Sequence, residues 1–491
     1  MSRSHKSPQS KRSQKTRRRQ QKKSRANERV RRRRNRLSAK EAINWFCGDK
    51  NIFSHLTFHG NIKWQANDLA RMALLFGWSE KNSVTDGFVE AAKRCKQLGF
   101  SIALTTYQGF MGALANYIHI FIPLLILQLQ RRMKEVGGEF YEIAGFVAIG
   151  FDGSRNSAAR TESNEAELCC PTYGESKKSK GAKKKTNPAP PQPQAWITLM
   201  WHMSLRLPWD WRLGPSHSSE RGHVQDMLAE GEFPENTLFC GDAGFVGFDF
   251  WRSILEKDCD FLVRVGSHVK LISQNMNWKY KRDGLVLCWP KDKQSKYQPL
   301  TLRLVSVKTG ATEVYLLTSV LDSSRLPKIS LVELYRLRWG IEVEFRGLKQ
   351  TLNGQTLRCR NVDRLYTELS WSILSMAVAE LLANREQISN METDATEKDE
   401  SKKYTPKKRS LAKTMRAIHD CLDELIETPE YGEDLLSRLA LAVTDNYQRT
   451  SNKKARYRPK NSEPKKLKPP KVRMLEPNEK DKLKTINANA A

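Results

Sequence analysis

The stretch LVELYRLRWGIEVEFRGLKQTL, residues Leu331 to Leu352, decides how the rest of the chain is interpreted. As an α-helix at about 100° per residue, it places six apolar side chains within an arc of roughly 80°. These are Leu334, Leu337, Ile341, Phe345, Leu348 and Leu352. On the neighbouring edge, within roughly 60° of each other, lie Tyr335, Arg338, Glu342 and Lys349. The pattern predicts a core-packed helix that presents one carboxylate flanked by two cations and a phenol.

A surface Arg–Glu pair at helical spacing would explain part of this edge equally simply. Two other acidic residues favour a functional interpretation. Asp152 follows the apolar run 146–151, and Asp242 follows the run 238–240, both predicted as buried strands. Three converging carboxylates repel one another and therefore require a divalent cation, of which Mg²⁺ is the natural one. Two such ions can activate a nucleophile and stabilise the leaving oxygen in phosphoryl transfer.

The motif Tyr335-x2-Arg338-x3-Glu342-x6-Lys349 resembles the YREK signature of bacterial DDE transposases of the insertion-sequence-four type. Asp152-Gly153-Ser154 and Gly241-Asp242-Ala243-Gly244-Phe245 resemble the first and second catalytic motifs of that family. The resemblance covers about residues 40–385. The chain departs from the family at one point, because many members have a basic residue directly after the second Asp, where this chain has Ala243.

The resemblance implies an α/β fold with an RNase H-like core and a β-strand insertion before the last catalytic acid. It implies that Asp152, Asp242 and Glu342 bind two Mg²⁺ ions, which Mn²⁺ can replace. By the same analogy Tyr335, Arg338 and Lys349 position the phosphates of the transposon end.

The activity implied is cleavage at the ends of an insertion sequence by water, followed by attack of the freed 3′-hydroxyl on target DNA. The partners implied are the inverted repeats at the transposon ends, the target DNA and a second copy of the chain in a synaptic dimer. In some relatives an aromatic residue of the insertion stacks a flipped base, for which Trp278 and Trp289 are candidates. A place in the core is the stronger expectation for Trp289.

The charge of the chain is concentrated at its two ends. Of 84 Lys and Arg residues, 18 lie in residues 1–40 beside one acidic residue, and 13 lie in residues 451–491 beside four. The remaining body is nearly balanced. Two cationic arms indicate a polyanionic partner, and we expect them to bind nucleic-acid phosphates without regard to sequence.

Composition, periodicity and the family resemblance together predict seven parts. They are a disordered basic arm (1–38), a helical DNA-end-binding domain (39–140), the first part of the core (141–258, with a Lys/Pro-rich linker loop at 174–195), the β insertion (259–325), the second part of the core with the YREK helix (326–385), a C-terminal helical region (386–450) and a disordered basic tail (451–491).

Other patterns bear on cellular location and on metal sites. The longest apolar run, Ile118 to Leu129, is interrupted and shorter than the roughly 20 residues that span a bilayer. We therefore expect no membrane partner and a cytoplasmic, nucleoid-associated protein. The nine cysteines include no C-x2-C pair, which argues against a zinc module. His217, Glu220 and His223 fit a helix-capping segment better than a metal site.

Two other hypotheses remain open from the sequence. One is a DNA-binding protein without catalysis, either a decayed transposase or a repressor of transposition. The other is an RNase H-like nuclease, which would not explain the edge formed by Tyr335, Arg338 and Lys349. The apolar helix predicted at Leu369 to Leu382 fits a dimer surface or a monomer core equally well.

Overall fold

The computed structural model describes residues 38–169, 192–273, 283–309, 312–352, 356–396, 409–423, 434–444 and 468–490. The chain forms two compact units. Unit 1 consists of Met1–Arg132 and Thr367–Thr444, and unit 2 of Met133–Tyr366 and Asp445–Ala491. The N-terminal and C-terminal helical regions, predicted as separate parts, therefore belong to one unit. The linker predicted at 174–195 and the basic arm at 1–38 lie almost entirely outside the described residues.

Unit 1 is helical. It contains a helix at residues 38–47, η1 (Lys50–Phe53), α2 (Ala66–Gly77), α3 (Val84–Leu98), most of α4 (Tyr107–Gly137), most of α11 (Val362–Thr396), α12 (Leu411–Asp423) and α13 (Leu435–Ala440). Local chemistry sets the ends of α3, because the Ser83 hydroxyl accepts a hydrogen bond from the Asp86 amide and Gly99 ends the helix with φ +72°. The helices predicted near residues 68–76 and 83–98 are confirmed.

The apolar stretch of α11 lies in the core of unit 1. Leu369, Leu374 and Leu382 are fully buried. A side chain at Gly77 would collide with Ser375, so only glycine allows α2 this close to α11. The Trp78 indole N–H donates to the Ser375 carbonyl at 2.8 Å. These contacts favour the monomer-core alternative for this stretch over a dimer surface.

The helix α4 has partners in unit 1. The ring of Phe121 lies 4.8 Å from that of Phe53, and the Gln128 amide donates to the Phe46 carbonyl at 3.0 Å. By length and composition, the segment Tyr107–Phe140 would also suffice to cross a membrane. Core helices pass the same test, so the expectation of no membrane partner stays a prediction.

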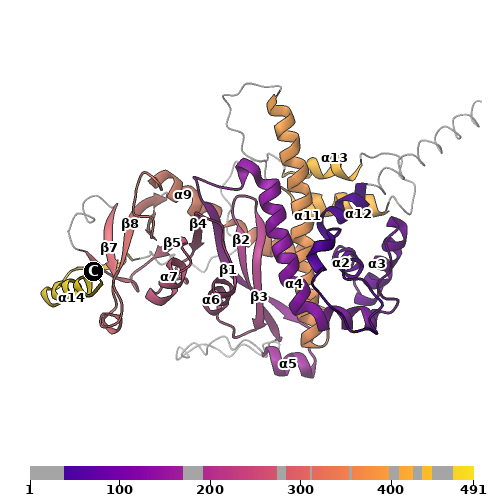
Figure 1. Ribbon diagram of the computed structural model, residues 1–491, viewed down its shortest axis with the longest axis horizontal. Coiled ribbons are helices and arrows are strands. Elements are labelled where there is room, and N and C mark those ends of the chain that lie inside the picture. The colour runs from indigo at the N-terminus through magenta and orange to yellow at the C-terminus, as the bar shows by residue number, and fades with distance from the viewer. Residues whose placement is uncertain are drawn as a thin grey trace, which may run out of the picture. The chain divides into compact units, whose positions relative to one another are not determined.

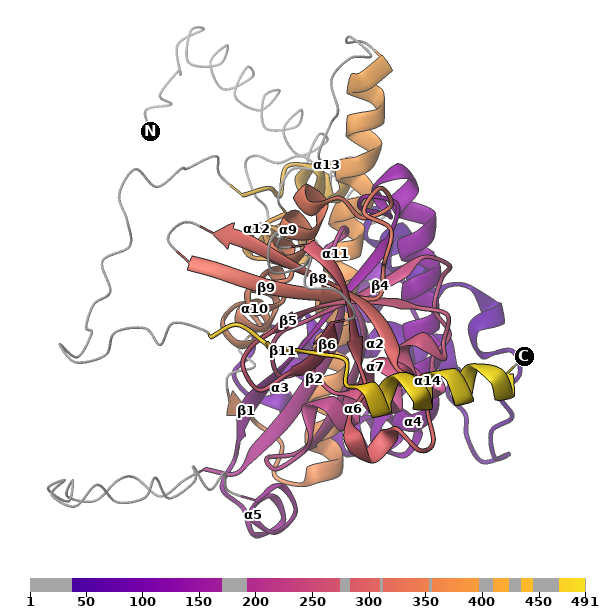
Figure 2. The same ribbon diagram turned by 90° about the vertical axis from the view of Figure 1, so that its left-hand side faces the viewer.

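Unit 2 is built on one mixed sheet, in the order β11-β6-β7-β8-β9-β5-β4-β1-β2-β3, with β10 pairing with β1 (Figures 1 and 2). The strands are β1 (Val147–Ala158), β2 (Gln194–His202), β3 (Leu207–Pro215), β4 (Thr237–Gly241), β5 (Asp260–Val265), β6 (Lys270–Ser273), β7 (Asp283–Cys288), β8 (Leu300–Thr309), β9 (Thr312–Thr318), β10 (Thr356–Leu357) and β11 (Lys471–Met474). Antiparallel pairs join β1, β2 and β3, whereas β4 and β5 run parallel to β1.

Helices of unit 2 connect and cover these strands. They are η2 (Gly138–Phe140), α5 (Glu162–Leu168), α6 (Glu220–Glu230), α7 (Phe248–Leu255), η3 (Lys291–Lys293), α9 (Lys328–Leu337), α10 (Gly340–Arg346), the π-helical turn η4 (Gly347–Thr351) and α14 (Pro477–Ala490). The helix predicted at Glu220–Glu230 is confirmed. Residues 147–151 of β1 are all buried, as expected for a strand between two partners under helices.

The β insertion differs from its prediction at its first strand. The predicted boundary at residue 259 assigned β5 to the insertion, but β5 pairs in parallel with β4 and belongs to the central part of the sheet. The antiparallel strands β7, β8 and β9 were predicted correctly, and β9 continues the sheet by pairing with β5. The insertion therefore extends the central sheet rather than forming a separate one.

The prediction of a disordered tail at 451–491 is wrong for residues 468–490. There β11 pairs in parallel with β6, and the Lys471 amide donates to the Val269 carbonyl at 3.0 Å. Leu475 and Leu483 pack against a buried cluster of Ile272, Leu287 and Trp289. This segment is rich in Lys and Pro, and its few apolar residues contact their partners only in the folded sheet. Composition alone therefore does not predict that the segment is ordered.

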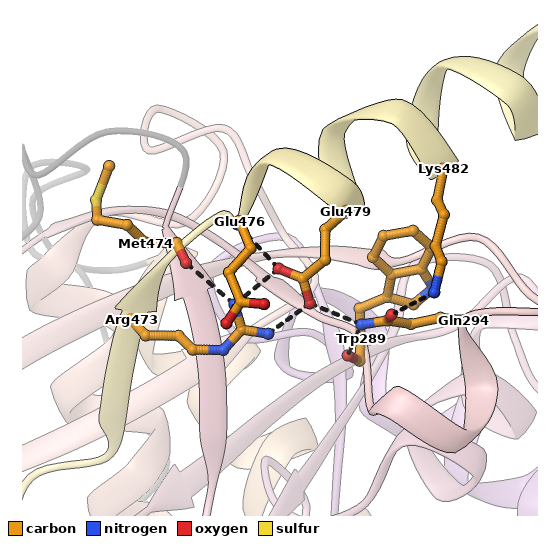
Figure 3. Close-up of polar contacts among 7 residues, drawn as sticks. All are labelled: Trp289, Gln294, Arg473, Met474, Glu476, Glu479 and Lys482. Atoms are coloured by element: carbon orange, nitrogen blue, oxygen red, sulfur yellow. Dashed lines mark hydrogen bonds and ion pairs between the residues drawn. The ribbon is translucent and has the colours of Figure 1, made fainter.

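Polar contacts fix this C-terminal segment in place (Figure 3). Arg473 donates to the carboxylate of Glu479 at 2.5 and 2.7 Å, and the Gln294 amide donates to the same carboxylate at 2.8 Å. The Glu476 amide adds a further bond at 3.1 Å. Glu479 is only 2% exposed, so its charge is compensated entirely within the protein.

Candidate active site

Strand register brings Asp152 and Asp242 side by side. The parallel pairing of β1 and β4 aligns Gly150 with Cys240. Each aspartate follows its aligned residue by two positions, so both project from the same side of neighbouring strands. The Asp242 side chain is held by the Gly244 amide, which donates to its Oδ1 at 2.7 Å.

Asp152 does not end its strand, contrary to the prediction of a strand followed by a turn. The strand β1 continues to Ala158 because β2 still pairs with it where β4 has ended, with Asp152 opposite Leu199. As a result, the side chain of Asp152 is held more rigidly than it would be in a turn. Its backbone is fixed on one side by β2, while its other side is open at the end of β4.

The environment of Asp152 disfavours its charge. Burial raises the pKa of Asp152, and the neighbouring Asp242 raises it further. The Gly153 amide, which donates to Oδ1 at 2.9 Å, and the cation of Arg338 act in the opposite direction. The guanidinium of Arg338 lies 3.8 Å from Oδ2 of Asp152. The two carboxylates carry more negative charge than the single Arg338 cation can balance, so a further cation would be attracted to them.

The predicted single helix from Leu331 to Leu352 is interrupted at Arg338 and Trp339. The helix α9 ends at Leu337, and α10 begins at Gly340. A side chain at Gly340 would collide with the ring of Trp201 on β2, so glycine is required for α10 to approach the sheet.

The break directs Arg338 toward β1. Its Cγ lies 3.5 Å from the position that a Cβ on Gly150 would occupy, and the side chain is almost completely buried. Of the predicted apolar stripe, Leu334, Ile341, Phe345 and Leu348 are buried, whereas Leu337 and Leu352 are half-buried.

Lys349 and Tyr335 lie on the same part of the protein. The ammonium of Lys349 donates to the Ser154 hydroxyl at 2.7 Å, and burial lowers the pKa of Lys349. Ser154 is two residues from Asp152, on the same face of β1. The Tyr335 ring lies 5.7 Å from the Arg338 guanidinium, and its hydroxyl is buried without a hydrogen-bond partner among the described residues. Three of the four YREK residues thus gather over β1 near Asp152.

Glu342 is placed differently. It lies on α10 with an exposed side chain, and the buried acid of this helix is Glu344. Within the described ranges, no three His, Cys, Asp or Glu side chains are grouped closely enough to hold a metal ion. The structure therefore brings Asp152 and Asp242 together but leaves Glu342 facing solvent.

The sequence places Glu220 in a helix-capping segment but does not predict its contact with β1. This residue opens α6 after Ser219, whose hydroxyl caps the helix by accepting from the Gly222 amide at 3.2 Å, so the predicted capping segment is confirmed. A Cβ on Gly153 would lie 2.5 Å from Oε1 of Glu220. The pKa of Glu220 is raised to about 7 by burial and by the charges of Asp152 and Asp242. No spacing along the chain signals this contact, because it depends on α6 packing beside β1.

The other candidates of the sequence analysis have simpler roles. His223 shares a hydrogen bond of 3.0 Å with the Thr198 hydroxyl, and His217 is exposed. Trp289 is 3% exposed and its indole N–H donates to the Tyr297 carbonyl at 2.8 Å, which places it in the core as expected. Trp278 lies outside the described residues.

The donor set fits a divalent cation of the Mg²⁺ type. Both aspartates offer hard oxygen atoms, and the pKa of Asp152 is raised first by burial and, to a lesser extent, by the charge of Asp242. Cys240, two residues before Asp242, is buried, and burial raises the pKa of its thiol to about 12, so it offers no thiolate to a cation there.

Comparison with known proteins agrees with the motifs. Residues 197–377 match the family described as "Transposase DDE domain". The matched segment includes Asp242 and Glu342, and Asp152 precedes it. Residues 197–377 are thus similar to transposase DDE domains, and the resemblance of the chain to transposases of the insertion-sequence-four type is confirmed.

Two curated relatives share parts of the sequence. The protein described as "Putative transposase y4zB" of Sinorhizobium fredii (strain NBRC 101917 / NGR234) is 23% identical over 155 residues, which are 30% of this chain and 43% of the relative. The "Transposase InsG for insertion sequence element IS4" of Escherichia coli (strain K12) is 36% identical over 77 residues, 15% of this chain and 17% of the relative. The chain thus matches less than half the length of either relative.

Among solved structures, a piggyBac transposase synaptic complex with hairpin DNA is similar. The alignment covers 85% of this chain and 87% of the chain in that structure. The TM-score is 0.37 and the sequence identity 12%.

Proposed function

We propose that this protein is a DNA transposase that cuts at the ends of its own insertion sequence and joins the freed 3′-ends to target DNA. The observation that carries the proposal is the register of β1 and β4, which sets Asp152 beside Asp242 under Arg338 and Lys349. The strand order β3-β2-β1-β4-β5, with β2 alone antiparallel to its neighbours, supports an RNase H-like core.

In this proposal Asp152, Asp242 and Glu342 hold divalent cations, Mg²⁺ or in its place Mn²⁺. When bound, such ions activate water and stabilise the leaving oxygen of a phosphodiester. The exposed side chain of Glu342 is free to move toward an incoming ligand. It lies four residues after Arg338 on α10, which packs against β1.

The cationic side chains have the role of holding DNA. Arg338 is fixed by Gly150 and Asp152, so its charge is positioned before DNA arrives. Lys349 is held by Ser154, and its lowered pKa shows that it lies where water screens charge poorly. Tyr335 has a buried hydroxyl that can donate to a phosphate oxygen.

The DNA partners proposed are the inverted repeats at the transposon ends and the target DNA. The basic segments 1–40 and 451–491 support non-specific binding to phosphates, and the helical region 39–140 is proposed to bind the transposon end. A dimer that bridges two ends, acting in the cytoplasm at the nucleoid, completes the proposal.

The test is cleavage of DNA that carries the element's ends, in Mg²⁺ or Mn²⁺. We expect Asp152→Asn, Asp242→Asn and Glu342→Gln to bind end DNA normally but to cut it at least about 1,000-fold more slowly, since each removes metal-binding charge. Glu333→Gln, which changes an exposed acid of α9, is the matched control and should cut normally. Normal cutting by all three variants would contradict the assignment.

A second function is favoured by one observation, the exposed position of Glu342. A chain whose third acid never joins the aspartates would be a catalytically inactive DNA-binding derivative or a repressor of transposition. Such a protein would retard end DNA in a gel but would never nick it in either metal.

A further inference from the structure

Arg303 is a buried cation in the β insertion. It lies on β8, opposite Leu285 of β7 and Thr318 of β9, and is 3% exposed. Its Nε and Nη2 donate to the two carboxylate oxygens of Asp283 at 2.8 and 2.6 Å. Its Nη1 donates to the Leu326 carbonyl at 2.8 Å. The guanidinium therefore joins β7 and β8 to the segment that follows the insertion.

Leu326 lies directly before α9. The helix begins at Lys328, and its N-cap residue, Pro327, makes no capping hydrogen bond through its side chain. A helix that starts without a capping side chain depends on the contacts of the residues before it. Leu326 is fully buried, and Arg303 holds its carbonyl. The bond from Arg303 therefore restrains the position at which α9 begins.

A second arginine, Arg325, holds the same segment through weaker contacts. Its guanidinium lies 3.2 Å from the carboxylate of Asp260 on β5 and donates to the Asn236 side chain at 3.0 Å. The Arg325 side chain is 47% exposed, and exposed ion pairs contribute little because water screens them. Arg303 donates its three hydrogen bonds from a buried position, where such bonds are stronger. Of the two arginines, Arg303 is thus the tighter restraint on the start of α9.

The shape of the guanidinium matters for this restraint. Its N–H groups lie in one plane as a rigid fork, so a two-bond contact with Asp283 fixes the direction of the N–H that meets the Leu326 carbonyl. The ammonium of a lysine has no such fixed geometry. The carbonyl is therefore held at a defined place relative to β7 and β8.

The other end of α9 lies at the candidate active site. Tyr335 is in the last turn of the helix, and Arg338 is its C-cap residue, 3.8 Å from Oδ2 of Asp152. A helix of 10 residues is about 15 Å long and holds its two ends at a fixed separation. A shift at the start of α9 therefore displaces Arg338. Misplacement by about 1 Å can slow a reaction about 100-fold.

We propose that Arg303 is a positioning residue for DNA cleavage, which holds the start of α9 so that Tyr335 and Arg338 stand in place beside Asp152. The inference rests on the proposed function, because Arg303 acts only through residues of that site. It gives the β insertion a part in cleavage that requires no contact between Arg303 and DNA. The insertion then braces the helix that carries the cation nearest to Asp152.

The test compares the rate of cutting with the affinity for DNA. Single-turnover cutting of end DNA is measured in Mg²⁺ at saturating protein, beside the dissociation constant of the same DNA. We expect Arg303→Met to bind end DNA as wild type does but to cut it about 10- to 100-fold more slowly. Arg264→Met, which removes a half-buried arginine from β5, is the matched control and should cut normally. A purely stabilising role would lower the melting temperature of Arg303→Met and leave the cutting rate of the folded protein unchanged.

Asp283→Asn separates the bond to Leu326 from the ion pair. This variant removes the carboxylate charge but leaves Arg303 able to donate to the Leu326 carbonyl, so we expect lower stability with a nearly normal cutting rate. The double variant Arg303→Met/Asp283→Asn leaves neither charge without its partner and controls for unfolding of the single variant. It should cut as slowly as Arg303→Met. If Asp283→Asn is as slow as the double variant, the ion pair is responsible and the inference fails.

Hydrogen exchange tests the restraint on α9 directly. The amides of residues 331–337 should exchange faster in Arg303→Met and at the wild-type rate in Arg264→Met, with circular dichroism verifying that each variant is folded. Unchanged exchange in Arg303→Met would overturn the inference. If wild type cuts end DNA and Arg303→Met cuts it equally fast, only the inference fails. If wild type cuts no end DNA in Mg²⁺ or Mn²⁺, the proposed function fails.

Discussion

Two glutamates of unit 2 show how different surroundings shift the pKa of the same side chain in opposite directions. Glu479 is buried, and its pKa is lowered to about 2, first by Arg473 and also by the Glu476 amide and Gln294. Glu220 lies against Gly153, and its pKa is raised to about 7 by burial and by two aspartates. A carboxylate that accepts several hydrogen bonds stabilises the fold in its charged form, whereas burial beside two other carboxylates disfavours the charged form of Glu220.

The difference also has an energetic meaning. Sites that bind ligands commonly retain unfavourable local interactions that the rest of the fold must outweigh. In unit 2 the C-terminal segment supplies favourable contacts at the edge of the sheet, whereas Asp152 within β1 and Asp242 directly after β4 repel each other. Three experiments on these regions test the comparison.

The largest effect should follow removal of the C-terminal segment, in a chain that ends at Leu467. This deletion uncovers Trp289, Ile272 and Leu287, and burial of a large apolar side chain contributes about 1.5 to 3 kcal/mol. We expect unit 2 to lose roughly 3 to 5 kcal/mol of unfolding free energy. Amide hydrogen exchange should accelerate in β6 and β7. Unchanged exchange there would show that the segment contributes nothing to the sheet.

A smaller loss should follow Glu479→Gln. The substitution removes the charge that Arg473 and the Glu476 amide bind, and hydrogen bonds to charged groups contribute about 1.5 to 3 kcal/mol. Denaturant unfolding at pH 7 measures the change. Because the pKa of Glu479 is lowered, its contribution is present above its ordinary value of 4.5 and is lost as the pH falls toward about 2. If the variant is as stable as wild type at pH 7, Glu479 does not stabilise the fold and its contrast with Glu220 fails.

The smallest effect, with the opposite sign, is expected for Glu220→Gln in metal-free buffer. The raised pKa means that the folded protein holds this proton more tightly than the unfolded chain, so stability falls as the pH rises from 4.5 to about 7. The unfolding free energy of the variant does not fall over this pH range. The variant should therefore be about 1 kcal/mol more stable than wild type at pH 8, after allowance for solvent screening. Thermal unfolding across this pH range measures it. Lower stability of the variant at pH 8 would show that Glu220 is a structural residue.

Much of the site could be predicted because its signals are local. The spacing of Tyr335, Arg338 and Lys349 along one helix edge is visible in the sequence, and three of the four residues do gather over β1. The apolar runs before Asp152 and Asp242 predicted both strands, although β1 continues past Asp152 to Ala158. Their parallel register then aligns the two acids.

What could not be predicted depends on contacts between distant segments. The break of the helix at Arg338 follows from Gly340 meeting Trp201, about 140 residues earlier in the chain. The position of Glu220 depends on α6 packing beside β1. Residues 468–490 are ordered because β11 pairs with the edge of β6, and amino-acid composition does not predict this contact. In each case the deciding partner is set by topology rather than by neighbouring sequence.

The pairing of β11 with β6 has a consequence for synthesis of the protein. An unpaired strand at a sheet edge can recruit other chains, and β11 presents Lys471 and Arg473 where β6 would otherwise be bare. On the ribosome, β11 emerges roughly 10 to 40 s after β6, at about 5 to 20 residues per second. During that interval the edge of β6 lacks its partner strand and is open to pairing with other chains.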